Sequence, residues 1–156
     1  NTSSVSGIYG NVGQTNYGAA KAGIAAFTTI ASLELARYGV TVNAVAPVAL
    51  TRMTENLHPQ PKNDSERDVE SPRWIAPIVT WLASEESKAI TGRVFEASGR
   101  VLAIAEGWHR GPTHSPVDDA AQLGPIVEEL VTKARLNAGM DGKEGSWPQP
   151  DSDRSR

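Results

Sequence analysis

The sequence predicts an α/β fold built on a doubly wound parallel sheet. Residues 40–46 (VTVNAVA) form a β-branched run that ends before a proline, and residues 92–97 are typical of a final core strand. Apolar residues recur at helical spacing over 15–37 and 74–82. Strands joined by helices favour parallel pairing with right-handed crossovers, and such a sheet needs helices on both faces.

The chain begins with the expected end of a buried strand, residues 1–4. Open α/β sheets place their chemistry at the carboxyl ends of their strands. Gly7, Gly10 and Gly13 then mark a loop. Their spacing differs from the G-x-G-x-x-G of a dinucleotide-binding turn, so we predict no phosphate cradle at these glycines.

The predicted helix 15–37 has apolar residues on all sides. Thr15 or Asn16 can cap its start, and Gly39 is a natural stop after its end. Small residues form one face and larger apolar residues form the neighbouring faces: Ala19, Ala22, Gly23 and Ala26 on the first, and Ile24, Phe27, Ile30, Leu33 and Leu35 on the others. We therefore expect this helix to be buried on more than one side.

Polar connections and short elements make up the rest of the chain. Residues 51–72 are polar and contain three prolines, which predicts a long loop of the kind that forms lids or stays disordered. Residues 101–105 favour one more extended piece, and 118–137 have the spacing of an amphipathic helix ended by Gly139. Glycine, proline, serine and charged residues dominate 139–156, which we expect to be a flexible tail.

Composition excludes several classes of function. The chain has 156 residues, enough for one domain with a core. Hydrophobic residues make up 39% and charged residues 21%, and the net charge of −3 gives no basic footprint for nucleic acid. The lack of cysteine excludes disulfides and thiolate metal sites.

We expect no membrane partner and a cytoplasmic location of the bacterial type. No apolar run approaches the roughly 18 residues of a membrane span, and the first residues lack a secretory pattern. The last four residues do not match a peroxisomal address. His58, His109 and His114 lie in polar segments without ligand spacing, so we predict no metal site.

Three residues near the start form a candidate catalytic set. Tyr17 and Lys21 lie four positions apart, which places them one turn apart on one helix face. A phenol ionises near pH 10, and a lysine cation ~4 Å away is worth roughly 4 kcal/mol at an effective dielectric of about 20. We therefore expect Lys21 to lower the pKa of Tyr17 toward the range of efficient general acid–base catalysis. Ser4 can hold a substrate oxygen against the same phenol.

This set resembles the catalytic pattern of the short-chain dehydrogenase/reductases, in which a serine precedes the tyrosine by the 13 positions found here. Five stretches are similar in particular to the 3-hydroxyacyl-CoA dehydrogenase part of the peroxisomal multifunctional enzymes of type 2 and to its bacterial relatives. They are 2–11, 13–17, 46–54, 74–82 and 92–96. The resemblance implies that residues 1–138 are the carboxy-terminal part of such a Rossmann-type domain.

The resemblance implies a role for each residue of the set. Tyr17 would be the general acid–base, Lys21 would bind the ribose hydroxyls of the nicotinamide cofactor, and Ser4 would orient the substrate carbonyl or hydroxyl. Ser3 is the competing serine, disfavoured by its spacing to Tyr17, and backbone capping at the strand end is the alternative for both serines. The implied cofactor is NAD or NADP.

Pro47, Val48 and Thr51 are a second cofactor-binding element that the resemblance implies. In the family, a proline-glycine turn lies against the nicotinamide and a following threonine contacts its carboxamide. Here Val48 stands in place of the glycine, and the turn to Thr51 is one residue shorter. Both departures also occur in the multifunctional enzymes of type 2. The alternative for Thr51 is a helix cap.

The implied reaction is hydride transfer between the cofactor and a secondary alcohol or ketone, with 3-hydroxyacyl-CoA as the expected substrate class. The alternatives are a 3-oxoacyl-carrier-protein reductase and a hydroxysteroid dehydrogenase. Arg52, where the carrier-protein reductases commonly have an acidic residue, favours the CoA class. The resemblance also implies a homodimer or homotetramer formed through the helix 15–37.

A different class of function is also consistent with the sequence: a catalytically silent fragment that keeps the fold for oligomer contacts. The chain opens at Asn1 without a methionine and reaches Ser4 at once. In the family that it resembles, a glycine-rich cofactor turn precedes this point. We therefore expect a longer parent protein, and expect the 156 residues by themselves to be inactive.

Overall fold

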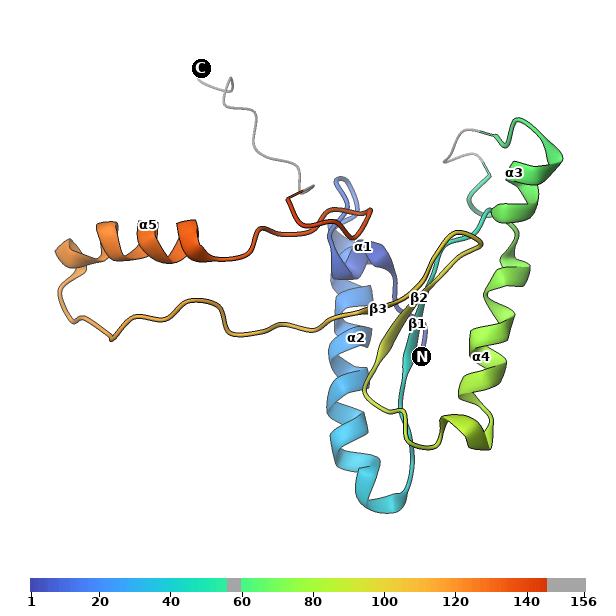
Figure 1. Cartoon of the computed structure of the whole chain (residues 1–156), viewed down its shortest axis with the longest axis horizontal. Helices are drawn as coiled ribbons and strands as arrows, with labels where there is room; N and C mark the ends of the chain where they lie inside the picture. The colour runs from blue at the N-terminus through green and yellow to red at the C-terminus, as the bar shows by residue number, and fades with distance from the viewer. Residues whose placement is uncertain (56–59, 146–156) are drawn as a thin grey trace. The chain divides into compact units, whose positions relative to one another are not determined.

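The computed structural model describes residues 1–55 and 60–145. Figure 1 shows its helices and strands along the chain. The chain divides into two compact units, Asn1–Glu106 and Gly107–Arg156. The first unit contains every residue predicted for the site.

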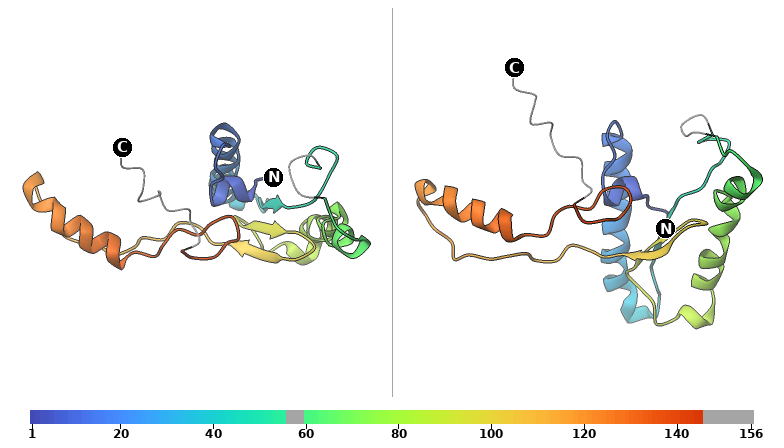
Figure 2. Two further views of the ribbon diagram at one scale, coloured as in Figure 1. Left: turned by 90° about the horizontal axis from the view of Figure 1, so that it is seen from above. Right: turned by 45° about the horizontal axis from the view of Figure 1, so that its top comes forward.

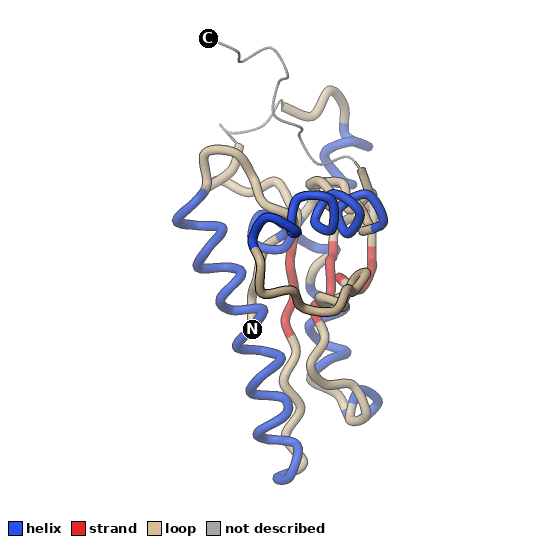
Figure 3. The backbone as a smooth tube through the Cα atoms, turned by 90° about the vertical axis from the view of Figure 1, so that its left-hand side faces the viewer, coloured by secondary structure: helices blue, strands red, loops and turns tan. Residues whose placement is uncertain are grey.

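The first unit is built on a three-stranded sheet in the order β1-β2-β3. The strands are β1 (Ala44–Pro47), β2 (Val94–Ala97) and β3 (Leu102–Ala105), and Figure 3 shows them side by side. β1 and β2 are parallel, with Ala44 beside Val94 and Pro47 beside Ala97. The strands predicted over 40–46 and 92–97 are thus confirmed, although each begins later than predicted.

β3 departs from the parallel pairing predicted for the sheet, because it runs antiparallel to β2. In the turn between them, the amide of Ser98 donates to the carbonyl of Val101 over 2.8 Å. The Ser98 hydroxyl accepts from the amides of Arg100 and Val101. A tight turn of this length joins antiparallel strands, whereas a parallel neighbour needs a long crossover.

Residues 1–3 lie along the other side of β1. Thr2 and Val45 form an isolated parallel bridge, in which the amide of Ser3 donates to Val45 over 2.8 Å and the amide of Val45 donates to Asn1 over 3.0 Å. The expected strand end is therefore present, in the parallel direction. A short helix α1 (Val5–Ile8) follows where the glycines predicted a loop, because the Ser4 side chain accepts from the Ser6 amide and caps it.

The long helix α2 (Thr15–Leu35) continues as a 3-10 turn to Tyr38 and ends at Gly39, which has a left-handed φ of 70°. Both bounds agree with the prediction for 15–37. The predicted cap is wrong, since Gln14 precedes the helix and no side chain caps it. Asn16 instead accepts a hydrogen bond from the next amide, that of Tyr17.

Only a narrow stripe of α2 is buried within this chain. It consists of Thr28, Ala31 and Ser32. The stripe lies over β1, whose Ala44 and Ala46 are fully buried. The larger apolar side chains Phe27, Ile30 and Leu33 are 59%, 55% and 75% exposed in this chain. The expected burial of a second side of α2, by the equivalent helix of another subunit, stays a prediction.

By length and composition, the segment Thr15–Tyr38 is long and apolar enough to cross a membrane. This corrects the expectation that no stretch approaches such a span.

The opposite face of the sheet is covered by α4 (Ala76–Leu82), as Figure 2 shows. Its Ile78 packs with Val45 of β1 and with Phe95 and Ala97 of β2. A 3-10 turn at Pro72–Trp74 precedes α4, so the helix predicted over 74–82 is confirmed with a slightly later start. Helices thus lie on both faces, as the fold class requires.

The segment predicted as the long loop 51–72 contains a helix, α3 (Asp64–Val69). The Asn63 side chain accepts from the amide of Glu66 over 2.8 Å, and the Glu66 carboxylate accepts from the amide of Lys62 over 2.7 Å. These reciprocal bonds form a capping arrangement that the prolines obscured in the sequence. The loop prediction is therefore wrong for α3.

The second unit contains the helix α5 (Leu123–Lys133), which a 3-10 turn at Ala120–Gln122 precedes. The amphipathic helix predicted over 118–137 is confirmed but shorter. Glu129 and Lys133 form an ion pair one turn apart, and the Lys133 ammonium lowers the pKa of Glu129. The expected boundary at residue 138 and the expected flexible tail stay predictions, and 146–156 lie outside the described residues.

Candidate active site

Ser4, Tyr17 and Lys21 come from two adjoining elements of the first unit. Ser4 is buried at the junction between the strand-like residues 1–3 and α1, and Tyr17 and Lys21 lie on the first two turns of α2. α1 packs against α2. The structure therefore brings the segments of the predicted catalytic set together at the carboxyl end of the sheet.

The Lys21 ammonium lies where the helical spacing predicts it. Its Nζ is 5.7 Å from the centre of the Tyr17 ring, within the range of a cation–π contact. The same Nζ donates to the Thr2 carbonyl over 3.0 Å. The cation thus lies beside the phenol ring and close to the strand end that carries Ser4. Its effect on the acidity of the phenol stays a prediction.

Ser4 has the capping role that was its alternative interpretation. Its Oγ accepts from the Ser6 amide over 3.1 Å and thereby caps α1. A hydroxyl has two lone pairs and one proton, so a capping bond that it accepts leaves the proton available for a substrate oxygen. Capping and substrate orientation are therefore compatible for Ser4.

The competing serine, Ser3, makes a different contact. Its side chain is fully buried, and its hydroxyl donates to the carbonyl of Lys21 over 2.8 Å. This bond ties the strand end directly to the α2 turn that carries Lys21. The contact favours a structural role for Ser3 and thereby favours Ser4 as the serine of the set.

Gly7 allows the close approach of α1 to α2. A Cβ at this position would lie 2.5 Å from the backbone nitrogen of Ala22 and 2.7 Å from the Cβ of Lys21. Gly18 contributes from the other side, because a Cβ there would lie 3.1 Å from the carbonyl oxygen of Ser6. The sequence analysis indicated Gly7 only as a loop position, yet Gly7 and Gly18 set the spacing between Ser4 and the Tyr17–Lys21 pair.

The phenol of Tyr17 is accessible, since the residue is 45% exposed. An acid–base residue must reach a substrate that arrives from solvent, so this exposure suits the predicted role. The helical geometry of α2 places Tyr17 one turn before Lys21.

Pro47 is the last residue of β1, and Val48 and Thr51 follow it at the same end of the sheet. Pro47 pairs with Ala97, and the amide of Val48 donates to the Ala97 carbonyl over 2.9 Å. Thr51 is exposed in a turn, where its carbonyl accepts from the amides of Thr54 and Glu55. Because residues 1–3 and β1 are parallel, Ser4 and Val48 both lie just beyond the carboxyl ends of adjacent extended segments.

Tyr9 and Glu96 form a contact that the sequence analysis missed. The Tyr9 hydroxyl donates a hydrogen bond to Oε1 of Glu96, on β2. Burial and this bond to the carboxylate raise the pKa of Tyr9 well above its usual value. The two residues lie 87 positions apart, so no local pattern could have paired them.

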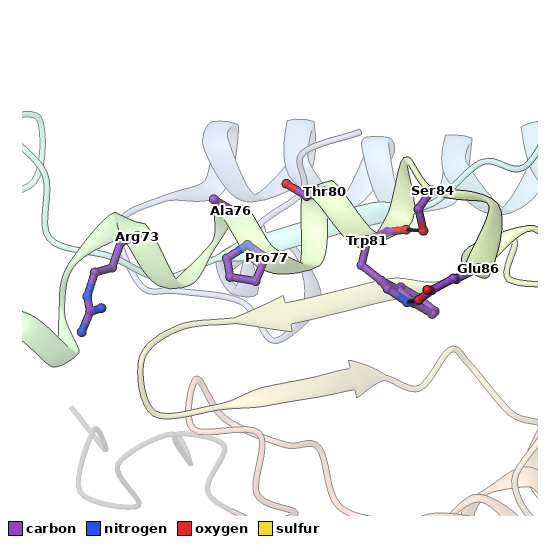
Figure 4. A pocket seen from close by; sticks show the side chains of 7 residues that line it. All are labelled: Arg73, Ala76, Pro77, Thr80, Trp81, Ser84 and Glu86. Atoms are coloured by element: carbon purple, nitrogen blue, oxygen red, sulfur yellow. Dashed lines mark hydrogen bonds between the residues drawn. The ribbon is translucent and has the colours of Figure 1, made fainter.

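A shallow, open hollow lies elsewhere, along α4. Figure 4 shows its lining side chains, among which the Trp81 indole donates to the Glu86 carboxylate over 3.1 Å. The lining residues are Arg73, Ala76, Pro77, Thr80, Trp81, Ser84 and Glu86. Because α4 and α2 cover opposite faces of the sheet, this hollow is separate from the candidate active site.

No group of three or more histidine, aspartate or glutamate side chains in residues 1–55 and 60–145 is arranged to hold a metal ion. His109 and His114 lie in the second unit, and His58 lies outside the described residues.

Comparison with known proteins gives matches over most of the chain. The family model described as "Enoyl-(Acyl carrier protein) reductase" matches residues 1–99. The "Peroxisomal hydratase-dehydrogenase-epimerase" of Saccharomyces cerevisiae is 41% identical over 108 residues, which are 69% of this chain and 11% of that protein. The "3-oxoacyl-[acyl-carrier-protein] reductase FabG" of Thermotoga maritima is 42% identical over 108 residues, which are 65% of this chain and 44% of that protein.

The fold has a solved counterpart. The crystal structure of a short chain dehydrogenase from Mycobacterium avium matches with a TM-score of 0.75 and 43% identity, and the match covers 89% of this chain and 44% of that one. The chain thus spans less than half the length of each of these three proteins.

Proposed function

Because the chain belongs to the short-chain dehydrogenase/reductase family, we propose that it carries the catalytic residues of a nicotinamide-dependent oxidoreductase. The observation that carries this proposal is the position of the Lys21 ammonium, which contacts both the Tyr17 ring and the strand end just before Ser4. We propose this activity for the whole protein, in which these residues act together with a complete binding site for NAD or NADP.

The residues present suit such a cofactor. An ammonium has three protons, and the bond from Lys21 to the Thr2 carbonyl uses one of them, so Lys21 has donors for ribose hydroxyls. Val48 and Thr51 are exposed beyond the end of β1, where a nicotinamide ring and its carboxamide would lie. When bound, the cofactor accepts or delivers the hydride.

The chain's own residues would manage the substrate oxygen and its proton. Ser4 donates a hydrogen bond to the oxygen and holds it toward the phenol. Tyr17 takes the hydroxyl proton when the alcohol is oxidised and returns it when the ketone is reduced. Lys21 supplies positive charge beside the phenol, which favours the phenolate formed during the proton transfer.

The proposed substrate class is 3-hydroxyacyl-CoA and the corresponding 3-oxoacyl-CoA. The yeast relative, whose name includes a dehydrogenase activity, supports this class. The FabG relative supports the alternative, a 3-oxoacyl-carrier-protein substrate. A hydroxysteroid is a third alternative in the same chemistry. Acetoacetyl-CoA, a 3-oxoacyl-carrier protein and a ketosteroid, assayed side by side with NADH and NADPH, distinguish the three.

We also propose association through α2, as a homodimer or homotetramer. The exposed Phe27, Ile30 and Leu33 on α2 support it, because large apolar side chains that stay exposed on one helix mark a surface that another chain can cover. The same exposed face favours the second candidate function, a catalytically silent protein that uses the fold for oligomer contacts.

We also propose a cytoplasmic location, which cell fractionation can check.

Replacing Tyr17 by phenylalanine in the complete gene product tests the proposal. The change removes the proton-transferring hydroxyl and keeps the ring, so we expect turnover to fall by about 10²–10⁴-fold. Absorbance at 340 nm follows the reaction, and NADH fluorescence measures cofactor binding, which should be retained. Tyr38→Phe is the matched control, because Tyr38 is 64% exposed at the other end of α2. Turnover that survives Tyr17→Phe would remove Tyr17 from the mechanism, whereas a wild-type protein without turnover on all three substrates would favour the silent alternative.

A further inference from the structure

The hydrogen bond from Tyr9 to Glu96 joins α1 to the sheet. Tyr9 is the residue that ends α1, and its amide donates to the carbonyl of Val5 over 2.8 Å. Glu96 lies within β2, beside Ala46 of the parallel strand β1. The bond is thus the side-chain link between the turn that begins at Ser4 and strand β2 of the sheet.

Glu96 lies on the face of the sheet that α1 and α2 cover. Its neighbours Phe95 and Ala97 pack with Ile78 of α4, on the other face. Since successive side chains of a strand point to opposite faces, Glu96 points away from α4. Its neighbour Ala46 is fully buried, so this face offers little water to a carboxylate. The Tyr9 hydroxyl supplies the hydrogen bond that a partly buried carboxylate requires.

α1 is held both against α2 and against the sheet. At Gly7, its backbone lies against the backbone of Lys21 and Ala22. At its end, Tyr9 is bonded to Glu96. Ser4 lies at the start of the same turn, and its carbonyl accepts from the amides of Gly7 and Ile8 over 2.9 and 3.2 Å. A change in the direction of α1 would therefore move the Ser4 hydroxyl relative to Tyr17.

We propose that Tyr9 and Glu96 are positioning residues of the reaction, whose hydrogen bond fixes α1 and so fixes the Ser4 hydroxyl opposite Tyr17. This inference rests on the proposed function. Neither residue contacts the reacting atoms, and both act through the placement of Ser4.

The acidity of Tyr9 agrees with a positioning role and not with an acid–base role. Burial and the bond to Glu96 raise its pKa well above the usual value for a tyrosine, near 10. A general acid–base is most effective when its pKa lies near the working pH. Tyr9 therefore keeps its proton, and the bond to Glu96 stays formed at neutral pH, whereas proton transfer is left to Tyr17.

Three single variants of the complete gene product, and one double variant, test the proposal through activity. Tyr9→Phe and Glu96→Ala each remove the bond, and we expect each to lower kcat by about tenfold or more, because small displacements of an orienting group are costly. KM and the Kd for NADH should change less than twofold. Glu96→Gln keeps an acceptor oxygen, and we expect it to retain most of kcat. The double variant Tyr9→Phe/Glu96→Ala should be no slower than either single variant.

A purely structural role predicts another pattern. If the bond only stabilises the fold, all variants would have a lower Tm or a smaller active fraction. The kcat per active site would then stay unchanged in every variant, Tyr9→Phe among them. That result would overturn the proposal, and so would additive losses of kcat in the double variant. Active sites are counted by cofactor titration in each variant.

A spectroscopic measurement tests the bond without relying on activity. Tyrosinate absorbance at 295 nm is followed with rising pH, and the Tyr9→Phe curve is subtracted from the wild-type curve. We expect the difference to develop only well above pH 10 and to move to lower pH in Glu96→Gln, which lacks the negative charge. A difference that develops near pH 10 in the wild type would show that the bond is absent, and would overturn the proposal.

The outcomes separate this proposal from the proposed function. If Tyr17→Phe keeps full turnover, the proposed catalytic role of Tyr17 fails, and the proposal that Tyr9 and Glu96 hold Ser4 opposite Tyr17 fails with it. If Tyr17→Phe is inactive and Tyr9→Phe turns over at the wild-type rate, the positioning proposal alone is overturned.

Discussion

Two small residues, Ser3 and Gly7, determine how the strand end and α1 meet α2. Ser3 bonds to the carbonyl of Lys21, and Gly7 lets the backbone of α1 approach that of Lys21 and Ala22. The predicted catalytic set is therefore held by neighbours that have no part in proton transfer. Their substitution should affect stability and the spacing of the site together.

Replacing Gly7 by alanine should destabilise the protein. The new Cβ would lie 2.5 Å from the Ala22 backbone nitrogen, so α1 and α2 must move apart. We expect a loss of about 1–3 kcal/mol, as for other overpacked positions, measured by urea denaturation. Gly124→Ala is the matched control, because a Cβ at Gly124 on α5 meets nothing within 4 Å. Equal stability of Gly7→Ala and Gly124→Ala would contradict the close packing.

The ionisation of Tyr9 makes the free energy of unfolding depend on pH in the alkaline range. Its pKa is raised in the folded protein, so above about pH 10 the unfolded chain loses this proton while the folded chain keeps it. The unfolded state then binds fewer protons, and the free energy of unfolding falls as pH rises. The contribution is fully present below about pH 10. Urea midpoints at pH 9, 10 and 11 should fall more steeply for the wild type than for Tyr9→Phe, and parallel curves would contradict this.

At the scale of the elements, α2 has two different roles on its two sides. Its small stripe, Thr28, Ala31 and Ser32, lies on β1, and its larger side chains remain exposed. The sequence predicted the length of α2 and its all-round apolar character. It could not predict which side the sheet covers, because small and large residues are both compatible with burial.

Replacing Leu33 by glutamate should disrupt association and leave the fold intact. Leu33 is 75% exposed, so within this chain the charge remains in water. In an α2 interface the same charge would be buried without a partner, which is costly. Light scattering coupled to size exclusion should show a smaller species, with an unchanged circular dichroism spectrum. Val12→Glu is the control, since Val12 is an exposed loop residue, 87% accessible. An unchanged mass for Leu33→Glu would place any interface elsewhere.

At the scale of the whole molecule, local patterns predicted those features that depend on neighbours in sequence. The Tyr17–Lys21 pair follows from helical spacing, and β1 from a β-branched run before Pro47. Two features that the sequence analysis missed also depend on local contacts, namely the cap at Ser4 that turns a glycine-rich loop into α1 and the tight turn at Ser98 that reverses β3. The bond from Tyr9 to Glu96 spans 87 positions, so it is a tertiary contact that no local pattern encodes.

The alternation along β2 has a consequence for how this domain tolerates insertions. Phe95 and Ala97 pack with α4 on one side, and Glu96 bonds to Tyr9 on the other. A one-residue deletion or insertion that shifts this strand would exchange its two sides. The Glu96 carboxylate would then point into the hydrophobic core under α4, and the Phe95 ring would point toward Tyr9. Length variation between versions of this domain should therefore be confined to connections such as 98–101, and a library of single-codon indels should recover folded clones there but not within 94–97.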